Sequence, residues 1–335
     1  MAAPATPAPT PIKQPKMSAA KRSETMTAYL FIAPYLISAA IFTFGLMAYS
    51  FYISFTDQEG AIDKKFGFVG ITNYVNALGD NQFLTTLANV FWYALIVTTL
   101  QTIGAVLLAT LLNSKMRFKQ FFRTVFYAPS VASSVVISMI FLLLYLKTGF
   151  INRGLEIIGL PNDTAWLQNA NGLFEIILPG DQQINNPLLR GPSVAWMAIM
   201  AMNIFTTIPT LMLMFLAALQ EIPGQLYEAA SIDGATKREQ FFKITLPLLR
   251  PTFVLVLVLS TIGTFQIFDQ VAVMTKGGPV NTTSTPGYLI YSKVLGEGAS
   301  PESGYGAAMA FILAMIIFTL TFLQRRFIEQ GSQKD

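Results

Sequence analysis

The 335-residue sequence contains no cysteine and no histidine, and each absence removes a class of chemistry. Without cysteine there is no disulfide framework and no thiol nucleophile. Without either residue, the usual ligand sets for zinc, copper and haem are missing, and so are catalytic triads and Cys–His dyads. We therefore expect neither a metal site nor a catalytic site, and the composition argues against an enzyme.

Charge is also scarce. Only 12% of the residues are charged and 53% are hydrophobic, whereas soluble domains carry roughly 25% charged residues. Burying charged side chains in hydrocarbon is costly, so a low charge content is typical of membrane proteins. The composition therefore predicts an integral membrane protein in contact with lipid.

Six apolar segments reach the roughly 20 residues that a helix needs to cross a bilayer. We predict an all-α membrane protein with six transmembrane helices. Three prolines, Pro34, Pro129 and Pro209, lie within these segments or at their ends, where they form either packing kinks or kinks that shape a pathway. The predicted spans lie near 28–54, 85–112, 124–146, 194–219, 252–273 and 305–324.

The distribution of basic residues predicts the orientation. Most of the 22 Lys and Arg residues fall on one side of the six predicted spans, and the side with the excess is cytoplasmic. Both termini are therefore predicted to be cytoplasmic, which agrees with an even number of spans.

This orientation divides the chain into regions. We predict a disordered, Pro-rich cytoplasmic tail at 1–17, which does not fit a signal peptide. A transmembrane domain follows at 18–327 and a cytoplasmic C-terminal tail at 328–335. Within the domain, 147–193 is a long extracytoplasmic loop and 221–251 is a long cytoplasmic loop. Long connections are often functional.

The predicted spans are nearly free of charge, and Asp269 is the one acidic residue that we place in them. Ion-coupled carriers usually hold buried charges in their spans, so this argues against a proton-driven carrier. Neutral polar groups suit a pathway for a neutral, hydroxyl-rich solute. Helix–helix hydrogen bonds, worth under about 1 kcal/mol per pair, are the structural alternative. The candidate pathway residues are Asn203, Thr206, Thr207, Ser260, Thr264 and Gln266.

The chain has no phosphate-binding loop of the G-x-x-x-x-G-K-[ST] type and so no energy source of its own. A transporter of this kind either takes energy from a partner or works as a secondary carrier or passive channel for a small neutral solute. The long cytoplasmic loop is the candidate surface for an energy-supplying partner.

Within that loop, Glu228 to Pro251 reads EAASIDGATKREQFFKITLPLLRP. This string resembles the EAA loop of permease subunits in binding-protein-dependent ABC importers. Leu219–Pro223 and the stretch from Phe268 to Pro279 resemble carbohydrate-type members such as maltose-type permeases, and the resemblance covers about 28–327. The positions that match the EAA signature include Glu228, Ala229, Ala230, Asp233, Gly234, Ala235, Phe241, Leu246 and Pro247.

The resemblance implies the type I ABC importer permease fold in the plasma (inner) membrane of a prokaryote. It implies two cytoplasmic ATP-binding subunits, an extracytoplasmic solute-binding protein and a second permease subunit, for which we favour a different chain. ATP and Mg²⁺ would be bound by the ATPase subunits, with no cofactor on this chain and no nucleic-acid partner.

The resemblance also assigns roles to single residues. A short helix of the loop would sit in a groove of the ATPase. Small Ala229 and Ala230 would allow close approach of the two backbones. Glu228 and Asp233 would pair with basic groups, and Gly234 would form the bend. Asn203 stands where maltose-type permeases place a sugar-contacting Asn. Ile267 is apolar where those permeases are polar, so the same sugar is not implied, and the loop near 167–192 is longer than usual.

Overall fold

A computed structural model describes residues 19–60, 66–114, 117–177, 186–297 and 299–332. The chain divides into two compact units, Met1–Tyr52 and Ile53–Asp335. The described residues form helices, and their only β pairing is two isolated bridges, Thr56–Phe68 and Gly172–Ser193. The all-α prediction is confirmed. The predicted tail at 1–17 and residues 333–335 lie outside the described residues.

The first unit contributes one long apolar helix. It comprises α1 (Ala19–Ser38), a π-helical segment (Ala39–Gly45) and α2 (Leu46–Ile53). Glu24–Ile53 is long and apolar enough to cross a membrane, and none of the residues in its most apolar window is buried. Pro34 lies inside α1 without ending it, as membrane helices allow. This helix contains nearly all of the first predicted span.

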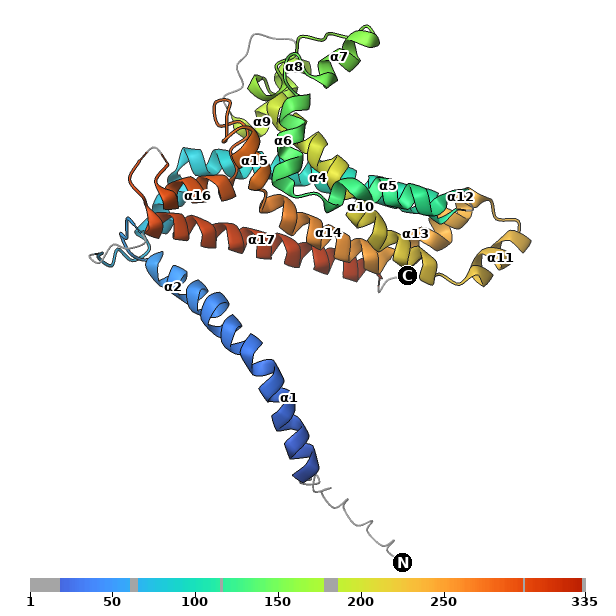
Figure 1. Cartoon of the computed structure of the whole chain (residues 1–335), viewed down its shortest axis with the longest axis horizontal. Helices are drawn as coiled ribbons and strands as arrows, with labels where there is room; N and C mark the ends of the chain where they lie inside the picture. The colour runs from blue at the N-terminus through green and yellow to red at the C-terminus, as the bar shows by residue number, and fades with distance from the viewer. Residues whose placement is uncertain (1–18, 61–65, 115–116, 178–185, 298, 333–335) are drawn as a thin grey trace, which may run out of the picture. The chain divides into compact units, whose positions relative to one another are not determined.

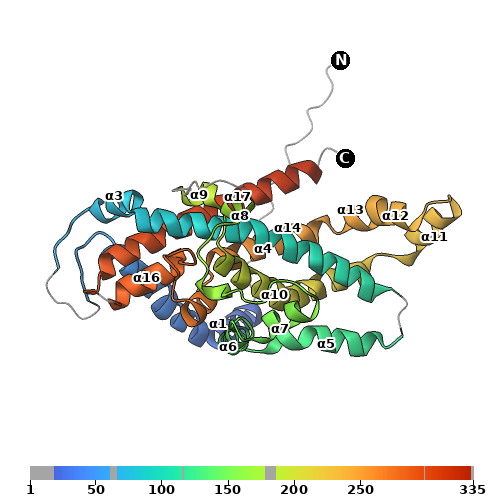
Figure 2. The same ribbon diagram turned by 90° about the horizontal axis from the view of Figure 1, so that it is seen from above.

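Long helices make up the second unit and run alongside one another (Figure 1; Figure 2 gives the view from above). They are α4 (Asn81–Asn113), α10 (Val194–Glu221), α14 (Arg250–Phe265) and α17 (Ser303–Ser332). After a short break α14 continues into α15 (Asp269–Met274), and Arg250–Met274 qualifies as one span. These helices correspond to four of the predicted spans. Pro209 lies inside α10, which passes through it.

Short helices occupy the two ends of this unit. At one end lie α3 (Thr72–Gly79) and α16 (Pro286–Leu295). The opposite end carries the segment between α10 and α14 (Figure 1). That segment contains α11 (Gly224–Ile232), α12 (Lys237–Gln240), a π-helical turn (Phe241–Thr245) and α13 (Leu246–Leu248).

The third predicted span, 124–146, differs from a single helix. It consists of α5 (Lys119–Val131) and α6 (Ser134–Leu144), which meet at an angle of 95°. Pro129 lies in the last turn of α5, and Ala132 is extended with ψ 148°. A proline lacks the amide donor that continues a helix, so Pro129 weakens this last turn of α5. The described residues thus give five candidate spans, or six if this bent pair is counted as one.

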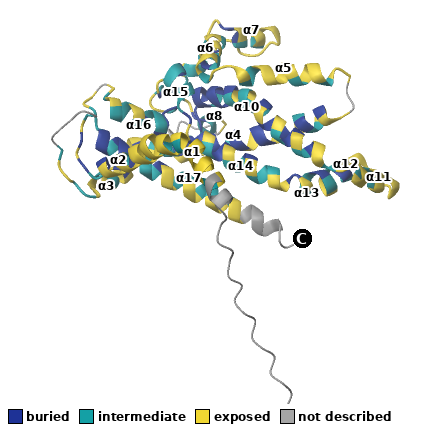
Figure 3. Ribbon diagram, turned by 60° about the horizontal axis from the view of Figure 1, so that its bottom comes forward, coloured by how far each residue is buried: buried dark blue, intermediate teal, exposed yellow. Residues whose placement is uncertain are grey.

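Two apolar clusters hold α4, α10 and α14 together. In the first, the rings of Tyr93 and Trp196 stack with centroids 4.7 Å apart, and Phe265 packs with them. In the second, Phe215 and Leu112 pack with residues of α14. Close backbone approach assists this packing, because a Cβ on Gly104 would lie 2.6 Å from the side chain of Ile208. Figure 3 shows the buried residues along these helices.

A polar layer separates the two clusters. On α4 it contains Thr98, Gln101 and Thr102, and on α14 it contains Ser260 and Thr264; each of the five side chains is at most 7% exposed. Four of them present an oxygen that finds no hydrogen-bond partner among the described residues: Thr98 Oγ1, Gln101 Oε1, Thr102 Oγ1 and Ser260 Oγ. Such orphaned groups are rare in protein interiors.

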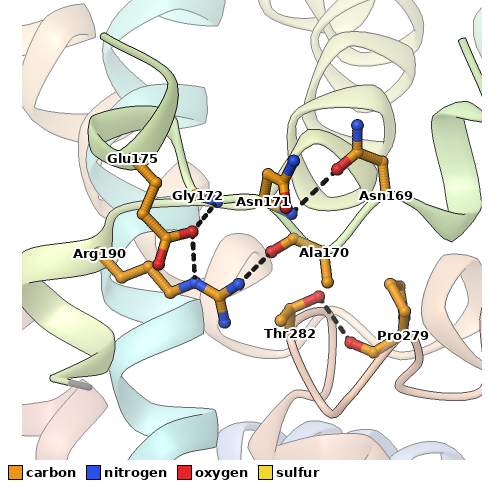
Figure 4. Close-up of polar contacts among 8 residues, drawn as sticks. All are labelled: Asn169, Ala170, Asn171, Gly172, Glu175, Arg190, Pro279 and Thr282. Atoms are coloured by element: carbon orange, nitrogen blue, oxygen red, sulfur yellow. Dashed lines mark hydrogen bonds and ion pairs between the residues drawn. The ribbon is translucent and has the colours of Figure 1, made fainter. Parts of the chain in front are cut away.

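The long connection between α6 and α10 is folded. It contains α7 (Phe150–Ile157), a 3₁₀ turn (Trp166–Gln168), α8 (Leu173–Ile177) and α9 (Pro187–Arg190). Glu175 accepts a hydrogen bond from Arg190 Nε at 3.0 Å, and Arg190 Nη2 donates to the carbonyl of Ala170 at 2.6 Å (Figure 4). One ion pair therefore closes this connection onto itself. The described part of the predicted loop, 147–177 and 186–193, is built from these short helices.

Candidate functional site

The helix α11 ends in a turn that requires glycine. Gly234 adopts φ +81°, in the left-handed region that side chains disfavour. Its N–H donates to the carbonyl of Ser231 at 3.2 Å, and the N–H of Ala235 donates to Ala230 at 2.8 Å. These two bonds form a Schellman motif, which satisfies the last carbonyls of a helix. The turn is the one that the sequence analysis predicts for Gly234.

Two residues after this glycine, Thr236 starts α12 with a capping box. The Thr236 hydroxyl accepts from the backbone of Glu239 at 3.3 Å, and the Glu239 carboxylate accepts from the backbone N–H of Thr236 at 2.9 Å. The hydrogen bonds from Thr236, with Lys243 nearby, lower the pKa of Glu239 below its ordinary value. The box fixes the direction in which the chain leaves the turn.

Polar side chains of α12 and of the π-helical turn form hydrogen bonds with α11. Gln240, only 3% exposed, donates from its amide to the Ser231 hydroxyl at 2.8 Å. The hydroxyls of Tyr227 and Thr245 lie 2.9 Å apart. Both contacts therefore join α11 to the second half of its own loop, the residues that lead into α14. Sequence analysis missed Gln240, which reads as an ordinary surface residue.

The predicted coupling residues separate into two groups. Glu228, Ala229, Asp233 and Gly234 are exposed, and Ala230 and Ala235 are half-buried. Ile232 lies beside them with 86% of its surface exposed. An exposed large apolar side chain between two carboxylates suits a contact with another protein. Ile232 is a second residue that sequence analysis missed.

The second group anchors the segment. Phe241 packs against the apolar cluster that contains Phe215, as does Ile222 at the end of α10. Leu246 and Pro247 are half-buried next to fully buried Leu249. The segment therefore presents Glu228 to Asp233 outward on a base of packed apolar residues.

A second candidate site lies where α14 breaks. Asn203, Gly263, Gln266, Ile267, Phe268, Asp269 and Gln270 line a cavity of about 240 Å³. We call it the α14–α15 cavity. Two of the predicted pathway residues, Asn203 and Gln266, therefore face the same space. Its amides offer hydrogen-bond donors and acceptors, and Phe268 offers an aromatic ring.

The other predicted pathway residues do not line this cavity. Ser260 and Thr264 belong to the polar layer and are buried, whereas Gly263 and Gln266 are exposed. Thr206 bonds to the carbonyl of Met202 on its own helix at 3.1 Å, and Thr207 donates to the Asn203 side chain at 3.2 Å. A pathway role for these four residues stays a prediction, and their observed contacts are structural.

A hydrogen bond at this cavity joins the two interrupted spans. The hydroxyl of Ser134, at the first residue of α6, donates to the carboxylate of Asp269, at the first residue of α15. The sequence analysis singles out Asp269 but gives it no partner. No group of three or more acidic residues able to hold a metal ion occurs among the described residues.

Comparisons with known proteins agree with this arrangement. The arabinooligosaccharide transport permease of Halalkalibacterium halodurans is 31% identical over 90% of this chain and 87% of its own length. The trehalose/maltose transport permease of Thermococcus litoralis is 29% identical over 91% of this chain and 95% of its own. A chain of the bacterial alginate ABC transporter, solved in complex with an alginate-loaded periplasmic protein, superimposes with a TM-score of 0.74 at 19% identity, covering 93% and 97% of the two chains.

Residues 101–330 match the family of inner membrane components of binding-protein-dependent transport systems. The prediction of a multi-pass transport subunit rather than an enzyme is thereby confirmed, and ATP is a ligand of partner subunits in this family. The match spans more than half of the sequence, and the chain therefore belongs to the permease components of binding-protein-dependent ABC importers.

Proposed function

We propose that this permease imports a sugar or a sugar-like neutral solute and is driven by cytoplasmic ATPases that dock on α11. The observation that carries the proposal is the exposed surface of α11 on a fixed base. Glu228, Asp233 and Ile232 face outward, while Gln240 holds the helix from behind. A helix that is exposed yet anchored can pass a movement of its partner to the spans.

The working assembly contains two ATP-binding subunits, a second permease and an extracytoplasmic binding protein. ATP binding would draw the ATPases together and pull on α11 of each permease. Because Tyr227 contacts Thr245, and Leu249 in the following turn is fully buried in the core, the pull would reach α14 directly. The opening of α14 toward the outside would admit solute from the binding protein.

The α14–α15 cavity supports a hydroxyl-rich solute. Asn203, Gln266 and Gln270 pair equally well with hydroxyl donors and acceptors. The ring of Phe268 offers an apolar surface on which the apolar face of a sugar ring can stack. The two relatives with named sugars, described above, agree with this assignment.

The double charge reversal Glu228→Arg plus Asp233→Arg tests the coupling role. We expect normal insertion and a drop of at least about tenfold in ATP-driven uptake by proteoliposomes that hold the complete transporter, since each reversal places like charges at a contact. Glu221→Arg, an exposed acid just outside α11, is the matched control and should transport normally. Ordinary uptake by the double variant would refute docking on α11.

A binding screen of the partner binding protein tests the solute class. Thermal unfolding of that protein is measured with neutral mono- and oligosaccharides, polyols, charged amino acids and short peptides. We expect stabilisation by a saccharide, because a bound ligand stabilises the folded state by mass action. Preference for a charged amino acid or a peptide would overturn the sugar assignment.

A further inference from the structure

The α14–α15 cavity contains one charged residue, Asp269, and no basic residue. Its carboxylate accepts a hydrogen bond from Ser134. Among the described residues no Lys or Arg lies within ion-pair distance of it. An unpaired carboxylate inside a membrane-spanning region is costly, and such groups commonly mark a functional site.

The position of Asp269 keeps the carboxylate in place. It lies in the first turn of α15, where acidic groups are stabilised by the helix dipole. The Ser134 hydroxyl engages only one of its two oxygens, Oδ2. Asp269 is half-buried and lines the cavity. Because the lining contains no cation, the carboxylate makes the electrostatic potential inside the cavity negative.

We propose that Asp269 selects solutes by charge: the cavity accepts neutral or basic saccharides and rejects acidic ones. This inference rests on the proposed function. A carboxylate only accepts hydrogen bonds, so it pairs with sugar hydroxyls and with an ammonium group. It repels a uronate or a phosphate, because two negative charges at close range repel each other.

The neighbouring side chains fit the same class of solute. Asn203, Gln266 and Gln270 are uncharged, so nothing in the lining compensates for the negative charge. Phe268 packs on Tyr291 with ring centroids 5.0 Å apart, which holds its ring at the break between the helices. A neutral sugar can place its apolar face on such a ring and its hydroxyls on the amides and the carboxylate.

Saturation-transfer NMR on the purified complex of permeases and ATPases, without the binding protein, tests this proposal. The probes are neutral di- and trisaccharides of glucose, galactose and arabinose and uronate-bearing saccharides of matched length. The wild type should bind at least one neutral probe and discriminate against its acidic counterpart. Asp269→Asn should reduce that discrimination at least about tenfold, since it removes a close like-charge contact. Asp269→Glu should keep it.

Ser134→Ala is the matched control for a purely structural role. It removes the hydrogen bond to Asp269 but keeps the negative charge, so the neutral-to-acidic ratio should stay within about twofold of the wild type. An Asp269→Asn variant that misfolds leaves Asp269→Glu and Ser134→Ala to decide. Loss of discrimination in either of them, or a wild type that binds acidic probes as well as neutral ones, overturns charge selection by Asp269. Failure of every neutral saccharide to bind would instead overturn the sugar assignment itself.

Discussion

Gln240 and Ser231 face each other within the segment between α10 and α14, and the Gln240 amide donates to the Ser231 hydroxyl at 2.8 Å. Gln240 is buried although it belongs to a four-residue helix at the surface. The same amide lies 3.4 Å from the carbonyl of Tyr227. One side chain therefore links both halves of α11 to the turn that leads into α14.

Replacing Gln240 with alanine should loosen α11 without unfolding the bundle. The change removes the hydrogen bonds from Gln240 to Ser231 and Tyr227, each with a net worth of about 0.5–1.5 kcal/mol. We expect faster amide hydrogen exchange confined to 224–235 and a several-fold loss of coupling between ATP hydrolysis and uptake. Gln225→Ala, an exposed glutamine on the same helix, should change neither. Unaltered exchange in Gln240→Ala would show that the hydrogen bonds of Gln240 do not hold α11 in place.

Gly234 and Gly224 form a natural pair for testing the bend. Neither would place a Cβ within 4 Å of another group, but Gly234 has φ +81°. Gly234→Ala should therefore destabilise the segment by about 1–2 kcal/mol through backbone strain alone, whereas Gly224→Ala at the start of α11 should be neutral or favourable.

The measurement is ATP-driven uptake together with protease sensitivity of 224–240. Gly234→Asn should recover part of the loss, because asparagine tolerates the left-handed region better than alanine. Equal behaviour of the two alanine variants would contradict the assigned role of φ at position 234.

Different features of this structure are predictable from the sequence to different degrees. The spans on α4, α10 and α17 follow from hydropathy, since the bilayer fixes the length of each apolar run. The break between α5 and α6 does not, because apolar residues continue across Ala132 and only Pro129 hints at it. The turn at Gly234 is predictable because it depends on the local backbone, in which only glycine adopts φ +81° without strain. The coupling role of Glu228 stays a prediction.

The direction in which a polar side chain points inside the bundle is a tertiary property. Ser260 and Gln266 read alike in the sequence, yet one lies in the polar layer and the other lines the α14–α15 cavity. Six residues separate them, more than a full turn and a half, so they occupy different faces. Gln240 is missed for the same reason, since its burial depends on contacts with Tyr227 and Ser231.

The polar layer makes a prediction about stability. Thr98 and Thr102 bury hydroxyls that have no partner among the described residues, whereas Thr110 on the same helix donates to the carbonyl of Val106 at 2.8 Å. Valine has nearly the shape of threonine, so Thr98→Val plus Thr102→Val should raise the unfolding temperature in detergent by removing unsatisfied groups, each worth about 1 kcal/mol or more. Thr110→Val, the matched control, should be neutral or slightly destabilising. A lower unfolding temperature for the double variant would mean that the two hydroxyls are satisfied in the folded protein.

The ion pair in the connection between α6 and α10 predicts where that connection opens. Arg190 joins Glu175 at 3.0 Å and also holds the carbonyl of Ala170. Both partners of the pair are largely shielded, with 28% and 19% of their side chains exposed, so the pair is worth more than a surface one. Arg190→Ala removes both the ion pair to Glu175 and the hydrogen bond to Ala170, so we expect proteolytic cleavage within 169–192 to accelerate several-fold while the spans stay intact. Arg153→Ala, an exposed arginine on α7, should leave the cleavage rate unchanged.

Uptake by Arg190→Ala distinguishes two roles for this connection. If the connection meets the binding protein, uptake at low binding-protein concentration should fall in Arg190→Ala and recover at high concentration. If it is only a spacer, cleavage should accelerate with no change in uptake at either concentration.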